Sequence, residues 1–144
     1  MRPLRKILLH ASGHAADTLR SLDRRHRARG LRSVGFHYVI RTDGTLERGR
    51  ELAESGAHCL GFNADSVGIC LCGEGVVTAA QWPVLARLLR RLSRRFPQLT
   101  LHTVRELDPW SDDPLRVDLT ALGAEFESQY TYDTAVRDWL NYIL

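Results

Sequence analysis

In the first third of the chain, residues 34–40 read VGFHYVI, and residues 42–45 read TDGT. The first run is β-branched and aromatic, which is typical of a strand. An Asp-Gly pair directly after such a run is a strong signal for a hairpin turn. We therefore expect an antiparallel hairpin whose second strand returns over residues 46–50.

Strands and helices alternate on both sides of this hairpin. Apolar runs predict further strands at residues 6–10, 67–72 and 99–102, and helical periodicity predicts helices over residues 16–29 and 78–96. The second helix opens on Thr78 and Gln81 in the spacing of a capping box and stops at Pro97. This order predicts an α/β fold, a single domain with a central mixed β-sheet flanked by helices.

The length and the hydropathy of the chain limit the classes of protein to which it can belong. A chain of 144 residues with 44% hydrophobic residues fits one domain. Its apolar runs, such as residues 7–9, are far shorter than the roughly 18 to 20 residues that cross a bilayer. The basic start, MRPLRK, is not followed by the apolar length of a signal peptide. We expect no membrane span and a product that is cytoplasmic as synthesised.

The charge is mildly basic, with 20 Lys and Arg residues against 17 Asp and Glu. Such an excess suits an anionic polymer such as nucleic acid, cell-wall glycan or a membrane surface. The arginines of residues 87–95 equally fit a solvated helix face. No nucleic-acid motif is visible, so nucleic acid is not an expected partner.

Three cysteines make an odd count without the spacing of a disulfide scaffold. Cys70 and Cys72 lie one residue apart, whereas paired zinc ligands are usually two to four residues apart. We expect small, reduced core residues.

Two histidines stand at the ends of predicted strands. His10 follows residues 6–9, His102 follows residues 99–101, and Asp113 comes eleven residues after His102. Two imidazoles and one carboxylate are sufficient for a catalytic zinc ion with an open fourth position. Histidines at strand ends are also commonly hydrogen-bonded structural residues, and the spacing alone leaves both interpretations open.

The chain resembles the type 2 N-acetylmuramoyl-L-alanine amidases, which include small phage endolysins and the animal peptidoglycan recognition proteins. The resemblance covers about residues 7–119. It rests on LLHAS (8–12), HRARG (26–30), VGFHYVI (34–40), DGT (43–45), GR (49–50), GAH (56–58), GFN (61–63), SVGI (66–69), Gly73, TAAQ (78–81), His102 and Asp113-Pro114.

The resemblance implies a Zn²⁺ ion held by His10, His102 and Asp113, with Asp112 as an alternative register for the third ligand. The metal-bound water would attack the amide between the lactyl group of N-acetylmuramic acid and L-alanine, in peptidoglycan or in soluble muropeptides. A chain of this kind reaches the wall by lysis or by a dedicated export route, or it recycles muropeptides in the cytosol.

Two departures from the family pattern concern catalysis. Phe36 stands where the phage and animal enzymes usually have Tyr, and Cys70 stands where the cytosolic recycling enzymes have Glu. General acid-base assistance, typically worth ~10²- to 10⁴-fold, must then come from elsewhere or be missing. Ser111 replaces a Lys or Thr, and its hydroxyl is the candidate catalytic donor to the oxyanion.

The same resemblance makes Phe36, Arg50, His58 and Asn63 candidate substrate-binding residues. Asn63 and His58 could instead brace their own loop, and Arg50 could pair within the hairpin. We expect the amidase-like domain at residues 1–119 and an aromatic-rich extension, packed on the same domain, at residues 120–144.

The first hypothesis is a zinc amidase. The alternatives are a peptidoglycan-binding module without hydrolysis, and an interaction protein that uses the extension.

Overall fold

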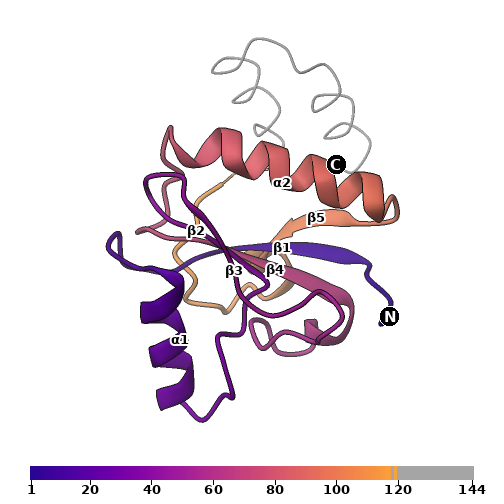
Figure 1. Cartoon of the computed structure of the whole chain (residues 1–144), viewed down its shortest axis with the longest axis horizontal. Coiled ribbons are helices and arrows are strands. Elements are labelled where there is room, and N and C mark those ends of the chain that lie inside the picture. Colours follow the sequence, from indigo (N-terminus) through magenta and orange to yellow (C-terminus); the bar gives the residue numbers. More distant parts are fainter. Residues whose placement is uncertain (118, 120–144) are drawn as a thin grey trace.

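A five-stranded sheet with helices on both sides forms the framework of the computed structural model, which describes residues 1–117 and 119 (Figure 1). The strands are β1 (Lys6–Ala11), β2 (Tyr38–Ile40), β3 (Leu46–Arg48), β4 (Ser66–Leu71) and β5 (Thr100–Thr103). The helices are α1 (Leu19–Ala28), α2 (Gln81–Arg95) and α3 (Val104–Leu107), with a 3-10 turn η1 at Asn63–Asp65. The predicted α/β class with a mixed sheet is confirmed.

The strands lie in the order β3-β2-β4-β1-β5. β1 runs parallel to both β4 and β5, β2 runs parallel to β4, and only the β2–β3 hairpin is antiparallel. The carboxyl ends of β1, β2, β4 and β5 therefore meet at one edge of the sheet, which is where open α/β sheets bind their ligands.

The two faces of the sheet are covered by different helices. Because side chains alternate along a strand, Ile7 and Leu9 of β1 pack with Leu85 and Leu89 under α2. On the opposite face, Cys70 of β4 packs with Leu22 of α1. Figure 1 shows α2 on one side of the sheet and α1 on the other. His10 and Leu8 point to the face away from α2.

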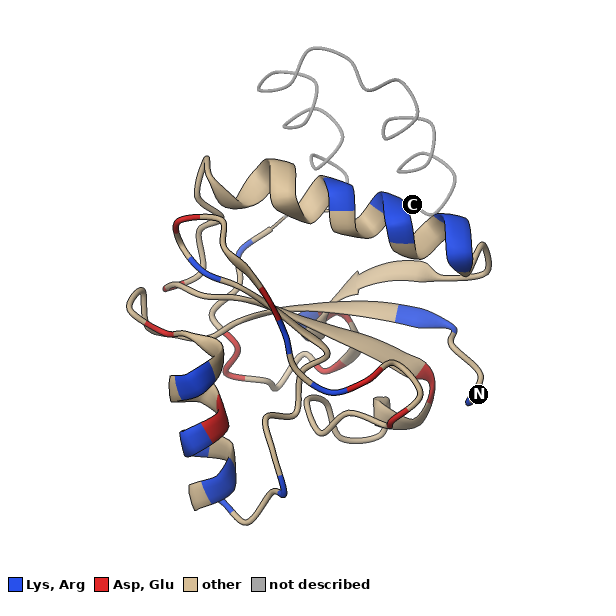
Figure 2. Ribbon diagram, viewed as in Figure 1, with Lys and Arg blue, Asp and Glu red and all other residues tan. Residues whose placement is uncertain are grey.

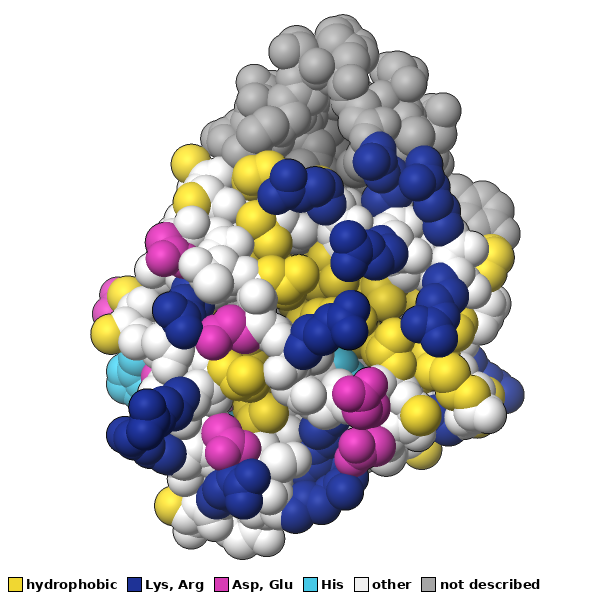
Figure 3. Space-filling view, viewed as in Figure 1, with side chains coloured by type: hydrophobic (Ala, Val, Ile, Leu, Met, Phe, Trp, Pro, Cys, Tyr) yellow, Lys and Arg dark blue, Asp and Glu magenta, His cyan; other side chains and the backbone are white. Residues whose placement is uncertain are grey.

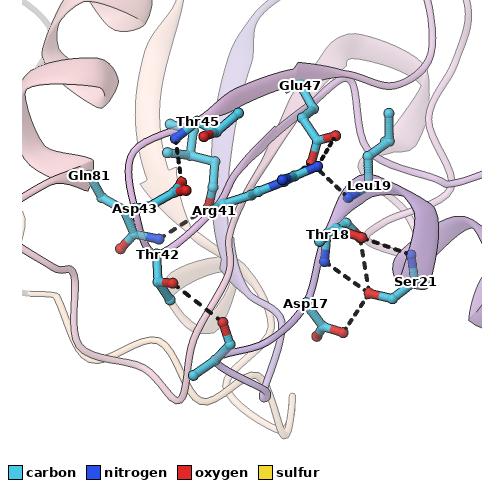
Figure 4. A network of polar contacts seen from close by, with 12 residues as sticks. Asp17, Thr18, Leu19, Ser21, Arg41, Thr42, Asp43, Thr45, Glu47 and Gln81 are labelled. Atoms are coloured by element: carbon cyan, nitrogen blue, oxygen red, sulfur yellow. Dashed lines mark hydrogen bonds and ion pairs between the residues drawn. The ribbon is translucent and has the colours of Figure 1, made fainter.

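The hairpin forms as predicted. The backbone N–H of Gly44 donates to the carbonyl of Arg41, and Gly44 has a φ of +88°, which glycine adopts without strain. Arg41 and Glu47 pair across the hairpin through two hydrogen bonds, and Glu47 also accepts the N–H of Leu19, which ties α1 to β3 (Figure 4).

The capping box at the start of α2 is also present. Thr78 Oγ1 accepts the N–H of Gln81, and Gln81 Oε1 accepts the N–H of Thr78. Gln81 is fully buried, and its amide nitrogen donates to the carbonyls of Ile40 and Cys72. The start of α2 is thereby fixed to the ends of β2 and β4.

Two elements differ from the prediction. Residues 34–37 are not in a strand. The N–H groups of Val34 and Gly35 bond to the side chains of Asp23 and His26 in α1, and the first N–H of this run that donates to β4 is that of His37. The chain also enters the short helix α3 directly after β5, an element that the sequence patterns did not predict. This helix carries Val104 to the edge where the strands end.

The predicted environments of cysteines and arginines are confirmed in the described residues. Cys59, Cys70 and Cys72 are free and buried. Lys and Arg residues colour bands of the α1 and α2 ribbons (Figure 2), and in the space-filling view Lys and Arg side chains are interspersed with hydrophobic side chains (Figure 3). This distribution is typical of solvated helix faces. Among the described residues, no helix has the length and apolar character needed to cross a membrane.

Candidate metal centre and binding cavity

A cavity of about 750 Å³ opens at the sheet edge where β1 and β4 end. It is lined by seven of the residues singled out in the sequence, namely His10, Phe36, His58, Asn63, Ser111, Asp112 and Asp113. His102 and Arg50 do not line it. A volume of this size lies within the range of small-molecule sites, roughly 300 to 1,000 Å³.

His10 and Asp113 form the centre of the cavity floor. The Nδ1 atom of His10 lies 3.2 Å from Oδ2 of Asp113. The other carboxylate oxygen accepts the N–H groups of Ala11 and Leu115, both at 3.0 Å. Burial by itself would raise the pKa of Asp113, but the hydrogen bond and charge of His10 and these two N–H groups lower it overall. The carboxylate is therefore ionised at neutral pH.

His58 contacts the other ring nitrogen of His10 and extends the series of hydrogen-bonded side chains. Its Nδ1 lies 2.8 Å from Nε2 of His10, and its Nε2 lies 3.1 Å from Oγ of Ser66. Burial, followed by the neighbouring His10 and His37, lowers the pKa of His58 to about 2. His58 is thus a neutral, internally bonded imidazole.

Phe36 forms an apolar wall of the same site. Its ring lies 4.9 Å from that of His10 in an edge-on arrangement and 5.3 Å from that of His26. The side chain therefore faces His10 and presents carbon atoms to it.

His102 does not join this group. The parallel register pairs Leu8 with His102, so His102 lies one pleat behind His10, roughly 6.6 Å along the sheet. Its imidazole contacts Thr100 and Glu106 instead. Across residues 1–117 and 119, no three His, Cys, Asp or Glu side chains are grouped as a metal site requires. Of the predicted set, the structure brings His10 and Asp113 into contact and places His102 apart from them.

Val104 follows directly after the last residue of β5 that pairs with β1. The register ends with Leu9 opposite Thr103, and Val104 begins α3 at the same end of the sheet as His10. Val104 lines the cavity, is buried, and packs with Leu8 and Cys59. A hydrocarbon side chain thus stands where a third donor would complete the centre.

The donor set does not fit the zinc ion that the resemblance implies. Catalytic zinc takes three protein ligands and keeps one position open. The described part of the chain offers His10 and Asp113, and the third position is the apolar Val104.

The remaining predicted residues have mainly bracing contacts. Ser111 lines the cavity, and its Oγ accepts the N–H of Asp113 at 3.1 Å. Asn63 also lines it, and its Oδ1 accepts the N–H groups of His58 and Cys59, both at 2.9 Å. The Arg50 guanidinium donates to the carbonyls of three residues outside the cavity, Ser33, Val34 and Ser55. In this structure Asn63 and Arg50 hold the loops that surround the site.

Arg2 is a residue that the sequence did not single out. Its guanidinium donates to the carbonyls of Leu52, Asn63, Ala64 and Ser66. These contacts span 50 or more residues along the chain, so no local pattern could have revealed them. Arg2 fixes the loop that carries His58 and Asn63.

Comparisons with known proteins agree with the fold. Residues 1–114 match the family model described as N-acetylmuramoyl-L-alanine amidase. An endolysin of Klebsiella phage KP32 is 33% identical over 115 residues, which is 72% of this chain and 76% of that protein. The endolysin of Escherichia phage T7 is 32% identical over 99 residues, or 63% of this chain and 66% of the relative.

Solved structures are similar over most of the chain. The amidase LysC from Clostridium intestinale superposes with a TM-score of 0.79 at 28% identity, covering 88% of this chain and 87% of LysC. Drosophila PGRP-LB, at 22% identity and a TM-score of 0.73, covers 92% of this chain and 84% of its own and shares the fold.

The fold, the cavity and these matches define a peptidoglycan amidase class of domain, and the family match and the endolysin relatives support peptidoglycan amidase activity. The chain belongs to the N-acetylmuramoyl-L-alanine amidase family.

Proposed function

We propose that this chain binds muramoyl peptides of peptidoglycan in the cavity beside His10 and does not perform zinc-dependent hydrolysis. The observation that carries this proposal is the donor set: His10 and Asp113 are in contact, and Val104, the residue after the last register pair of β5, lines the same cavity with hydrocarbon. Family membership supports peptidoglycan as the ligand, and the endolysin relatives support action on the cell wall.

The cavity offers the chemistry that a muramoyl peptide needs. Such a ligand carries sugar hydroxyls, amides and free carboxylates. Arg29 lines one part of the cavity, and Asp112 and Ser111 line another, so both signs of charge and a hydroxyl are present. The apolar ring of Phe36 adds a surface for the lactyl methyl group or a peptide side chain.

A second candidate is cleavage of the amide between the lactyl group and L-alanine. The family match and the retained pair of His10 and Asp113 favour it. Ser111 would be the hydroxyl donor to the oxyanion. Release of free stem peptide by the zinc-supplemented protein would establish this activity.

Binding is tested by calorimetric titration with a synthetic muramoyl pentapeptide. We expect saturable binding with one site per chain, and we expect backbone amide NMR signals of His58, Ser111 and Asp113 to shift while those of α2 stay in place. Arg29→Glu should weaken the affinity roughly tenfold through lost charge-assisted contacts. Arg24→Glu, in the adjoining helix α1 and outside the cavity, is the matched control. Absence of binding to the unaltered chain would refute the proposal.

A further inference from the structure

We infer that the side chain at position 104 decides whether this cavity holds a metal ion: with valine there the chain has no resident zinc, and one donor-bearing substitution completes a zinc site. This inference concerns metal content alone and does not rest on the binding of a muramoyl peptide. It starts from the sheet register, whose last pair is Leu9 with Thr103, so that Val104 follows at the end of the sheet where His10 lies and lines the same cavity.

The pair of His10 and Asp113 already has the spacing of two zinc ligands. Two atoms that each lie ~2.0 to 2.1 Å from a tetrahedral zinc ion are roughly 3.3 Å apart. Nδ1 of His10 and Oδ2 of Asp113 are 3.2 Å apart. The carboxylate is also held from behind by the N–H groups of Ala11 and Leu115, so that one oxygen remains directed at His10. Such outer hydrogen bonds orient metal ligands.

The directions of the hydrogen bonds from Ser66 through His58 to His10 also point to the gap between His10 and Asp113. Ser66 Oγ lies 2.6 Å from the carbonyl of Phe62, to which it donates, so it accepts from Nε2 of His58. Nδ1 of His58 is then the acceptor for Nε2 of His10. Nδ1 of His10 therefore faces the carboxylate of Asp113 across a gap that takes either a proton or a cation. Two groups that can bind a cation, the imidazole nitrogen of His10 and the carboxylate of Asp113, therefore border this gap.

The third side is closed by hydrocarbon. Val104 is 4% exposed, begins α3 and packs with Leu8 and Cys59. Because Val104 also lines the cavity, a larger side chain at this position has open space beside it. Histidine would bring an imidazole to the open side of the pair, and cysteine would bring a thiolate with a volume close to that of valine.

The test is zinc content of the folded full-length protein, measured by mass spectrometry of the metal after dialysis against micromolar zinc. We compare the unaltered chain with Val104→His, with Val104→Cys, which preserves the packing volume, and with Val104→Leu, which adds volume without a donor. Circular dichroism checks that each variant is folded. The double variant Val104→His with Asp113→Asn tests whether the new ligand works with the existing pair.

We expect less than one-tenth of a zinc ion per unaltered or Val104→Leu chain, on the order of background for a two-donor site. Val104→His or Val104→Cys should hold one zinc ion per chain, with an affinity at least about 100-fold higher, since even an outer-shell partner is worth 10- to 100-fold. Asp113→Asn should abolish the gain.

One zinc ion per unaltered chain would overturn the inference, because another residue would then complete the centre. Folded Val104→His and Val104→Cys chains that both lack zinc would overturn it as well. Either result leaves the titration with muramoyl pentapeptide as a separate test of ligand binding.

Discussion

Oδ2 of Asp113 lies 3.2 Å from Nδ1 of His10, although 103 residues separate the two, and both side chains are nearly buried. Their pairing joins the segment after α3 to the end of β1. The ionised carboxylate also accepts the N–H groups of Ala11 and Leu115, which closes this edge of the sheet.

Replacement of this carboxylate should destabilise the fold. Asp113→Asn keeps the shape but removes the charge that faces His10, and we expect a loss of about 2 kcal/mol in the free energy of unfolding. Urea denaturation measures the change. Asp112→Asn, at the neighbouring and exposed position, should change the free energy by less than about 0.5 kcal/mol. Equal effects of the two substitutions would show that the pair with His10 does not stabilise the chain.

Stability should depend on pH through His37. Burial lowers the pKa of His37 to about 4 despite a hydrogen bond to the carbonyl of Glu54. Above about pH 6.5 the imidazole is neutral in the folded and the unfolded chain. Between about pH 6.5 and 4 only the unfolded chain binds the proton, so the free energy of unfolding falls as the pH is lowered, with a slope of about 1.4 kcal/mol per pH unit for this group.

The contribution of His37 is isolated by substitution. His37→Gln should reduce the slope of the free energy of unfolding against pH between pH 6.5 and pH 4 by the contribution of about one proton. Thermal midpoints or urea midpoints across this pH range measure the change. His14→Gln, at an exposed position, is the matched control. A slope unaffected by His37→Gln would assign the pH dependence to other groups, such as His58, whose pKa burial also lowers.

Loss of the Arg2 side chain should loosen the loop around the cavity. Arg2→Ala leaves four backbone carbonyls, those of Leu52, Asn63, Ala64 and Ser66, without this donor. We expect a loss of about 2 kcal/mol and faster amide hydrogen exchange over residues 51–66. Arg5→Ala, at an exposed position, serves as the control. Unchanged exchange in Arg2→Ala would mean that the loop is held by its other contacts.

A chelator should leave the unaltered protein unchanged. Because His10 and Asp113 lack a third metal donor among the described residues, we expect the thermal midpoint to be the same with EDTA and with added zinc. Differential scanning calorimetry measures both. A midpoint that rises with zinc and falls with EDTA would reveal a metal bound to the folded state.

Sequence patterns predicted the parts of the fold that depend on local interactions. The Asp43-Gly44 turn, the Thr78–Gln81 capping box and the placement of His10 at a strand end follow from turn chemistry, capping and side-chain alternation. Residues 34–37 were predicted as strand because their composition is strand-like. Tertiary contacts of Val34 and Gly35 near α1 outweighed that preference.

The site required information that no local pattern contains. His102 lies in β5 and Val104 begins α3, so the register of β5 beside β1 decides which of the two lies nearer to His10. The sequence indicates that the strand exists but does not fix which residue lies opposite His10. The predicted extension at residues 120–144 lies outside the described residues and stays a prediction, as does the domain boundary at residue 119.

The central claim is that this cavity lacks the third donor for zinc-dependent cleavage. Mass spectrometry of a muramoyl pentapeptide, incubated with an equimolar amount of the protein in zinc-containing buffer, tests it most directly. The account predicts that the peptide is recovered intact although it binds. Release of the free stem peptide by the unaltered chain, and not by Asp113→Asn, would contradict it.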